Sequence, residues 1–123
     1  MAKKILVVDD EPHIVRLLKD ALSRKGYEVI TASAGDQAVA MAKAELPALI
    51  FMDVMMPNLS GFEACEAIRA EPLLEKTPIF LLTARGQERD VEQGKAVGAD
   101  RYLTKPFSPR QLAQLVEETL GGP

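Results

Sequence analysis

Carboxylates follow two apolar runs of the sequence, at the point where each run ends. Asp9 and Asp10 come directly after the run Ile5–Val8. Asp53 comes directly after the run Leu49–Met52. If both runs are neighbouring buried strands, three carboxylates meet at one sheet edge, where they repel one another unless a cation lies among them. The pattern therefore predicts a site for a hard cation such as Mg²⁺, which prefers oxygen ligands.

A hydroxyl and an ammonium group stand at the ends of two further β-rich runs. Thr83 ends the fourth run, and Lys105 directly follows the fifth. A cation among carboxylates lets an anionic phosphoryl group approach, and a lysine and a hydroxyl can bind the remaining phosphoryl oxygens. One carboxylate can itself act as the nucleophile and form an aspartyl phosphate. These residue types together favour phosphoryl-transfer chemistry.

Five β-rich runs alternate with five helical stretches along the chain. Strands are predicted at Lys4–Val8, Glu28–Ala32, Ala48–Asp53, Pro78–Thr83 and Arg101–Thr104. Helices are predicted at Pro12–Arg24, at Gly35–Ala44, after the cap residue Ser60, at Gln87–Val97 and after the cap residue Ser108. Both serines fit a capping box, with Glu63 and Gln111 three residues further on. The helix Gln87–Val97 has few apolar anchors, so we expect it to be the most mobile.

Strict alternation of strands and helices predicts an α/β fold with a doubly wound, five-stranded parallel sheet. Right-handed crossovers favour the strand order 2-1-3-4-5, in which the first and third strands are neighbours. The winding reverses between these two strands, and ligands bind beyond the carboxyl ends of strands at such a point. This topology places Asp9, Asp10 and Asp53 together.

Length and composition restrict the class of protein. With 123 residues, 47% hydrophobic and 27% charged, the chain is expected to form one domain over residues 1–123. The final residues 121–123 (Gly-Gly-Pro) stop a helix and fit the start of a linker. A net charge of -3 argues against direct nucleic-acid binding. The first apolar run is too short for a signal peptide or membrane span, which predicts a cytoplasmic protein.

Each candidate residue also has a purely structural interpretation. The aspartates fit turns, with Asp10 capping the following helix. Thr83 is a favourable strand residue, an isolated Lys105 fits a solvated surface, and Tyr102 fits a half-buried core aromatic. For each residue taken alone, the structural interpretation is favoured over the functional one. The coincidence of these residues at the ends of adjacent strands favours a functional site.

The sequence resembles a known family, the CheY-like receiver domain of two-component response regulators. The resemblance spans residues 3–120. Its motifs are Val8-Asp9-Asp10-Glu11, Asp53-Val54-Met55-Met56-Pro57-Asn58-Leu59-Ser60-Gly61, Leu82-Thr83-Ala84 and Lys105-Pro106-Phe107. It implies a flavodoxin-like fold.

The resemblance implies a role for each residue of the acidic site. Asp53 is the expected phosphoacceptor. Asp10 and Asp53 are expected to bind Mg²⁺ directly, together with the backbone carbonyl of Met55. Asp9 is expected to act on the cation mainly through a bound water.

The resemblance also implies a switch. Lys105 is expected to pair with the phosphoryl group, and Thr83 to hydrogen-bond a phosphoryl oxygen and shift toward it. Tyr102 is then expected to turn inward as Thr83 vacates space. This would couple Asp53 to the face formed by the fourth helix, the fifth strand and the fifth helix.

The expected function is signalling, because the family takes a phosphoryl group from a phosphohistidine. The donor would be a sensor histidine kinase or a phosphotransfer protein, and the altered face would control an output domain or a downstream protein. No enzymatic product is expected beyond the chain's own phosphorylation and dephosphorylation.

Two other classes fit the sequence less well. A phosphohydrolase of the haloacid dehalogenase type needs an aspartate two residues after its nucleophile, where this chain has Met55. A flavodoxin-like mononucleotide binder needs a first loop rich in serine, threonine and glycine, whereas Asp9, Asp10 and Glu11 repel phosphate. A degenerate receiver is disfavoured because all five key positions are intact.

Overall fold

The computed structural model describes residues 2–56, 59–84, 98–105 and 107–123. In chain order the elements are β1 (Lys4–Val8), α1 (Pro12–Arg24), β2 (Glu28–Ala32), α2 (Gly35–Glu45), β3 (Leu49–Asp53), α3 (Gly61–Arg69), the 3₁₀ helix η1 (Pro72–Leu74), β4 (Ile79–Ala84), β5 (Arg101–Lys105) and α5 (Pro109–Leu120). The predicted helix Gln87–Val97, and with it the expected mobility, lies outside the described residues. No helix in the described ranges is long and apolar enough to cross a membrane.

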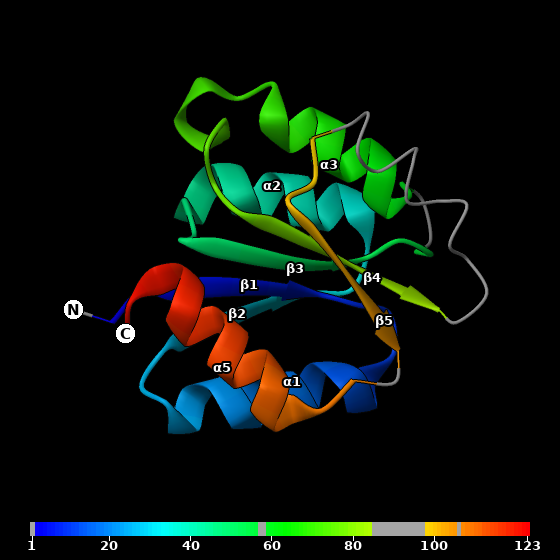
Figure 1. Ribbon diagram of the computed structural model, residues 1–123. Coiled ribbons are helices and arrows are strands. Elements are labelled where there is room, and N and C mark those ends of the chain that lie inside the picture. Colours follow the sequence, from blue (N-terminus) through cyan, green and yellow to red (C-terminus); the bar gives the residue numbers. More distant parts are fainter. Residues whose placement is uncertain (1, 57–58, 85–97, 106) are drawn as a thin grey trace.

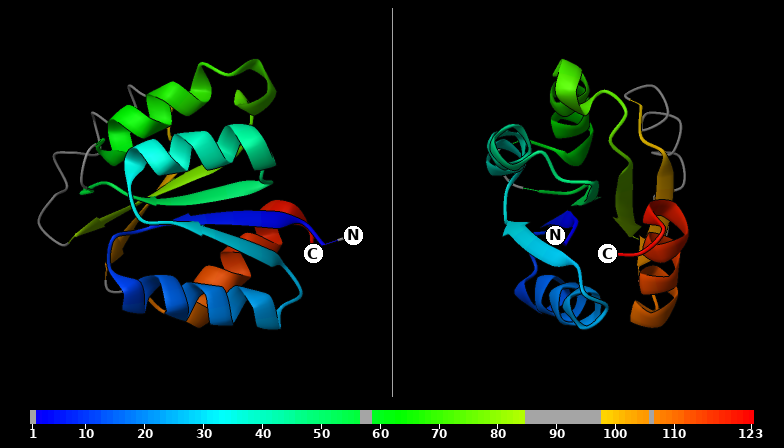
Figure 2. Two further views of the ribbon diagram at one scale, coloured as in Figure 1. Left: turned by 180° about the vertical axis from the view of Figure 1, so that it is seen from behind. Right: turned by 90° about the vertical axis from the view of Figure 1, so that its left-hand side faces the viewer.

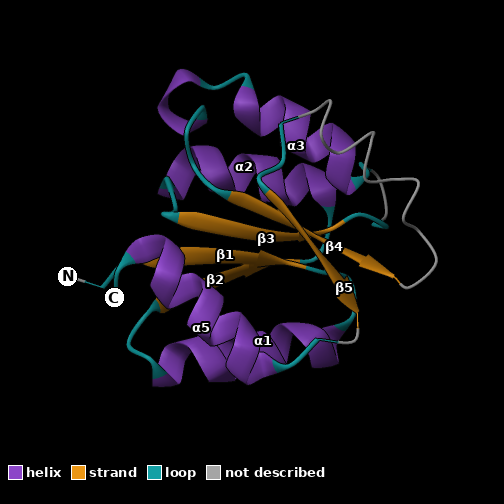
Figure 3. Ribbon diagram, viewed as in Figure 1, coloured by secondary structure: helices purple, strands orange, loops and turns teal. Residues whose placement is uncertain are grey.

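The five strands form one parallel sheet in the order β2-β1-β3-β4-β5, which confirms the predicted topology (Figures 1 and 3). The carboxyl ends of the strands lie on the right in Figure 1, and both chain termini lie on the left. In the register, Val8 of β1 pairs with Met52 of β3. Residue 9 and residue 53 therefore leave the sheet side by side.

Helices cover both faces of the sheet. Figures 1 and 2 show α2 and α3 on one face and α1 and α5 on the other. Because successive strand side chains point to opposite faces, β1 contributes Leu6 and Val8 to the apolar cluster under α2 and α3. Its Ile5 and Val7 join the cluster under α1 and α5. The central strands read as continuous apolar runs because both of their faces are buried.

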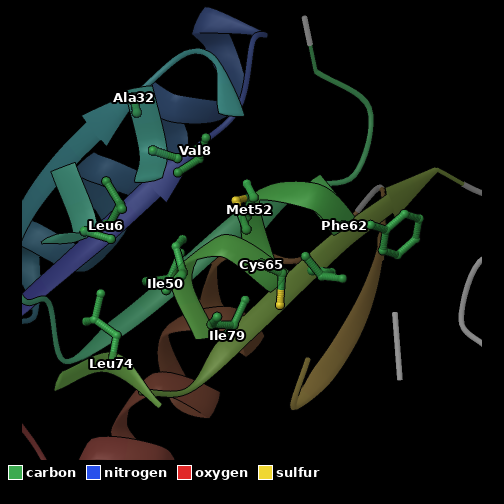
Figure 4. Packing of buried hydrophobic residues seen from close by; sticks show 14 of the residues in the cluster. Leu6, Val8, Ala32, Ile50, Met52, Phe62, Cys65, Leu74 and Ile79 are labelled. Carbon is green, nitrogen blue, oxygen red and sulfur yellow. The ribbon is translucent and has the colours of Figure 1, made fainter. Parts of the chain in front are cut away.

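Cys65 is a core residue of α3. Figure 4 shows it among the apolar side chains of Ile50, Met52 and Ile79. It is fully buried, and burial raises the pKa of its thiol to about 11. The thiol is therefore neutral near pH 7 and packs as a small apolar group.

The predicted boundaries are correct to within one residue for every described strand. β3 begins one residue later than predicted, β4 is displaced by one residue, and β5 continues to Lys105. At α3 the Ser60 hydroxyl accepts from the Glu63 N–H at 3.2 Å, and the Glu63 carboxylate accepts from the Ser60 N–H, a complete capping box. At α5 the Ser108 hydroxyl accepts from the Gln111 N–H at 3.3 Å.

Arg69, the last residue of α3, joins segments that are far apart in the sequence. Its guanidinium donates four hydrogen bonds, to the carbonyl oxygens of Leu74, Thr77 and Gly98 and to Oδ2 of Asp100. The same Asp100 oxygen accepts from the backbone N–H of Ile79 at 2.8 Å, and Ile79 begins β4. Arg69 thus fixes the amino ends of β4 and β5, opposite the predicted site.

We expect Arg69→Ala to lower the free energy of unfolding by about 2–3 kcal/mol, because three carbonyls and one carboxylate lose their donor. Arg24→Ala is the control, since Arg24 is exposed in the last turn of α1. Its loss should stay within about 0.5 kcal/mol. Urea denaturation measures both. Equal losses for the two variants would show that the Arg69 contacts do not stabilise the fold.

Candidate functional site

The site is built from the carboxyl ends of neighbouring strands. The backbone hydrogen bonds between strands continue just past the strand ends. The Asp9 N–H donates to the Ala32 carbonyl at 3.2 Å. The Val54 N–H likewise donates to the Leu82 carbonyl at 3.1 Å. Asp9 and Asp53 therefore stay aligned with the sheet, and both are buried, at 1% and 6% exposed.

Each of these two aspartates uses one carboxylate oxygen in a local turn. Oδ1 of Asp9 accepts from the N–H of Glu11 at 3.0 Å, and Oδ1 of Asp53 accepts from the N–H of Met55 at 3.2 Å. An aspartate that accepts two residues further on forms such a turn. The turn interpretation is thus right for both, yet it leaves Oδ2 of each for other partners. Asp10 does not cap α1, because the cap position belongs to Glu11 and has no side-chain cap hydrogen bond.

Lys105 brings one ammonium group to three carboxylates. Its Nζ lies 2.8 Å from Oδ2 of Asp9 and 3.3 Å from Oδ2 of Asp53. It also lies 3.2 Å from Oε1 of Glu11. The lysine side chain is 15% exposed and reaches from β5 across the end of β4. The ammonium therefore lies against carboxylates that follow β1 and the one that ends β3.

Four carboxylates make up the acidic cluster. Asp9, Asp10, Glu11 and Asp53 each offer one oxygen, and these oxygens lie within 4.8 Å of one another. Among the residues that the structure describes, four carboxylates face one ammonium, which leaves a surplus of negative charge at a partly buried position. An all-oxygen donor set with surplus negative charge fits a hard divalent cation.

Glu11 is the member of the cluster to which the sequence interpretation gave no positive role. Its signal was only its position, directly after the aspartate doublet. Residue type and spacing could not show that its side chain turns back to Lys105.

The site shifts the pKa of its central groups. Burial, and then the charge of Asp9, raises the pKa of Asp53 from 3.8 to about 6, although Lys105 and the Met55 N–H act in the opposite direction. Burial lowers the pKa of Lys105, but the close contact with Asp9 and the charges of Asp53 and Asp9 outweigh it and raise that pKa overall. Lys105 is therefore a permanent positive charge.

The other predicted residues lie around this centre. Thr83 is 5% exposed and stands one residue beyond Leu82, the β4 partner of Asp53. Tyr102 pairs with Leu81 and packs, half-buried, against the cluster under α2 and α3. Met55 has an exposed side chain, and its backbone rather than its thioether faces Asp53.

Two glycines allow the loop after β3 to lie close to its neighbours. A Cβ at Gly61 would lie 2.3 Å from the Asp53 carbonyl oxygen, and the Gly61 N–H donates to the Val54 carbonyl at 2.9 Å. A Cβ at Gly35 would lie 2.0 Å from the Leu59 carbonyl oxygen. Only glycine fits either position without moving backbone. Sequence alone does not indicate this role, because the contacts come from tertiary structure.

A groove of about 690 Å³ opens beside the acidic cluster, between α1 and the residues that join β2 to α2. Asp9 and Asp10 form one end of it, and Arg16, Lys19 and Asp20 of α1 line its side. Asp53 and Lys105 do not line it. The groove therefore adjoins the site rather than containing it.

Comparisons with known proteins agree with this geometry. Residues 5–117 match the family described as response regulator receiver domain. The chain is 51% identical over 120 residues to the alkaline phosphatase synthesis transcriptional regulatory protein PhoP of Bacillus subtilis. This match covers 98% of the chain and 49% of PhoP, so the chain spans about half the length of that relative.

Solved structures show the same fold. The chemotaxis response regulator CheY4 of Vibrio cholerae superposes with a TM-score of 0.91 at 38% identity, covering 98% of this chain and 100% of that one. The receiver domain of a Pseudomonas aeruginosa sensor histidine kinase, with a magnesium ion coordinated in its active site cleft, gives 0.89 at 32% identity, covering 99% and 100%. With the family match over most of its length, the chain belongs to the response regulator receiver domains.

Proposed function

We propose that Asp53 accepts a phosphoryl group from a phosphohistidine of a sensor histidine kinase or a phosphotransfer protein, in the presence of Mg²⁺. The observation that carries this proposal is the position of Asp53, buried at the sheet edge with its Oδ2 3.3 Å from the Lys105 ammonium. Residues 1–123 would act as one signalling unit that catalyses only its own phosphorylation and dephosphorylation.

The transfer needs one nucleophilic oxygen and a route for the leaving electrons. A carboxylate oxygen of Asp53 attacks phosphorus, and the new P–O bond forms as the P–N bond to the donor imidazole breaks. The bonding pair leaves on the imidazole nitrogen, and Asp53 becomes a mixed anhydride. In dephosphorylation, water attacks phosphorus and releases inorganic phosphate and the free carboxylate.

Lys105 supplies fixed positive charge for this reaction. Its ammonium already lies beside Oδ2 of Asp53 and is held from the other side by Oδ2 of Asp9 at 2.8 Å. A phosphoryl group on Asp53 would present oxygens to the same ammonium, and charge-assisted hydrogen bonds of this kind are strong. Lys105 would therefore favour both the transfer and the phosphorylated state.

A cation is the second source of positive charge. When bound, Mg²⁺ supplies charge that offsets the carboxylates and draws in phosphoryl oxygens. Asp10, Asp53 and the carbonyl of Met55 would hold it directly, and Asp9 through a water. The Pseudomonas aeruginosa receiver domain, which holds a magnesium ion in its active site cleft and is 32% identical, supports Mg²⁺ binding by this chain.

Thr83 and Tyr102 would carry the signal away from Asp53. The Thr83 hydroxyl, at the buried end of β4, would hydrogen-bond a phosphoryl oxygen and shift toward it. Side chains two residues apart on a strand share a face, so Tyr102, opposite Leu81, lies on the same face as Thr83. Movement of Thr83 would thus leave space into which the Tyr102 side chain turns, and this would alter the surface near β5 and α5. A local change at Asp53 would in this way shift the balance between two conformations of that surface.

The altered surface would act on an output domain or a downstream protein. PhoP, a transcriptional regulatory protein about twice as long as this chain, supports an output of that kind. The net charge of -3 argues against direct contact between this domain and nucleic acid. Partners of these classes imply a cytoplasmic location.

Radiolabelled acetyl phosphate tests the proposal. Wild-type protein should become labelled in Mg²⁺ and remain unlabelled in EDTA, and Asp53→Asn should abolish labelling because the nucleophilic oxygen is lost. Asp20→Asn, the same change at an exposed aspartate of α1, should label like the wild type. Labelling that survives in Asp53→Asn would show that another residue is the acceptor.

The raised pKa of Asp53 also predicts how stability depends on pH in EDTA. With a pKa of 3.8 unfolded and about 6 folded, the native state binds more protons between these values, so stability falls as the pH rises through them. Asp53→Asn removes the titrating carboxyl group and with it this loss of stability at higher pH. The variant should be more stable than wild type at about pH 7, by on the order of 1–2 kcal/mol, with the difference narrowing toward about pH 4.

Urea denaturation across the pH range measures this difference, with Asp20→Asn as the control for loss of a carboxylate. The assignment fails if Asp53→Asn is less stable than wild type at neutral pH, or if its advantage grows as the pH falls.

A further inference from the structure

Glu11 occupies an unusual position among the groups around Lys105. Its backbone N–H is fixed to Oδ1 of Asp9 at 3.0 Å, at the start of α1. Its carboxylate reaches back to Nζ of Lys105 through Oε1 at 3.2 Å and faces Nε2 of His13 through Oε2 at 3.5 Å. The main chain of Glu11 is therefore fixed by Asp9, while its carboxylate lies at the solvent-exposed entrance of the site, here called the mouth.

The three carboxylates that contact Lys105 differ in burial. The side chains of Asp9 and Asp53 are 0% and 9% exposed, whereas that of Glu11 is 47% exposed. A pair with an exposed carboxylate is screened by water and salt and contributes little. The contact with Glu11 is therefore the easiest of the three for Lys105 to give up.

A phosphoryl group on Asp53 would make that exchange necessary. The Lys105 ammonium donates to the carboxylates of Glu11 and Asp53 and forms an ion pair with Asp9 at 2.8 Å. New phosphoryl oxygens beside Asp53 would need a share of the N–H donors of this ammonium. Since Asp9 is buried and holds Lys105 from inside, the partner released would be Glu11.

We propose that Glu11 is a positioning residue for Lys105. In the unphosphorylated protein its carboxylate holds the ammonium toward the mouth of the site and adds negative charge where an anionic phosphodonor enters. This inference rests on the proposed function and deepens it, because it assigns to Glu11 a control over the rate at which Asp53 is phosphorylated.

The contacts of Glu11 favour this role over cation binding. Its carboxylate oxygen lies within 4.8 Å of those of Asp9, Asp10 and Asp53, which alone is compatible with a fourth ligand. Oε1 is paired with Lys105, and Oε2 lies 3.5 Å from Nε2 of the exposed His13, so the carboxylate is directed toward these two side chains. Neutralising Glu11 should therefore change the phosphorylation rate and lower the Mg²⁺ affinity far less than Asp10→Asn, which removes a proposed direct ligand.

The test compares Glu11→Gln, which keeps the size of the side chain and removes its charge, with the matched control Glu45→Gln. Glu45, whose side chain is exposed to a similar extent as that of Glu11, pairs with Lys4 at 3.3 Å at the opposite end of the sheet. At saturating Mg²⁺, Glu11→Gln should be phosphorylated by acetyl phosphate about two- to fivefold faster than wild type, the range for an exposed pair.

The charge of the donor and the ionic strength separate this role from a structural one. The gain should be smaller with phosphoramidate, which carries less negative charge than acetyl phosphate, and should shrink at high salt. Glu45→Gln should match wild type throughout. A rate that is unchanged or slower in Glu11→Gln would overturn the proposal.

Two further measurements do not depend on phosphorylation. In EDTA, the ¹³Cε and ¹Hε resonances of Lys105 should shift in Glu11→Gln and stay in place in Glu45→Gln. Calorimetric titration should show a much smaller loss of Mg²⁺ affinity for Glu11→Gln than for Asp10→Asn. Unmoved Lys105 resonances, or a loss of Mg²⁺ affinity as large as that of Asp10→Asn, would overturn the positioning role.

The results also separate this inference from the proposed function. Wild-type protein that takes no label, or labelling that persists in Asp53→Asn, would overturn the proposed function and this inference with it. Normal labelling of Asp53 with no effect of Glu11→Gln would overturn the inference alone.

Discussion

Repulsion among carboxylates at one end of the sheet is the constraint on which the rest of the site depends. Four carboxylate oxygens lie within 4.8 Å of one another, and in the described part of the chain one ammonium, that of Lys105, contacts this cluster. Burial makes the imbalance costly, and the pKa of Asp53 rises to about 6 as a result. A site that is short of positive charge attracts a divalent cation, and a cation draws in an anionic phosphoryl group.

Several separate features of the fold bring these charges together. The parallel order places β1 beside β3, and local turns use Oδ1 of Asp9 and of Asp53 so that both Oδ2 atoms face Lys105. Gly61 and Gly35 let the loop after β3 lie against its neighbours. At the far end of the sheet, Arg69 fixes the start of β4 and β5. The repulsion is tolerated because apolar strands, buried on both faces, stabilise the sheet that imposes it.

Much of this could be predicted from the sequence, because its signals are local. Continuous apolar runs indicated buried parallel strands, and strict alternation gave the strand order. Since the strand ends then meet at one edge, Asp9, Asp10, Asp53 and Lys105 could be grouped without coordinates. The remaining features depend on side-chain reach or close approach between distant segments. The contact of Glu11 with Lys105 spans 94 residues and that of Arg69 with Asp100 spans 31. No periodicity or motif encodes such pairs.

The central claim is that the Asp53 carboxylate lies in an environment short of positive charge, which a divalent cation relieves. Carbon-13 NMR titration of the Asp53 carboxyl group tests it most directly. In EDTA the carboxyl should titrate near pH 6, well above its ordinary value of 3.8, and added Mg²⁺ should move the midpoint downward. A midpoint near 3.8 in EDTA, or one that Mg²⁺ does not move, would contradict the account.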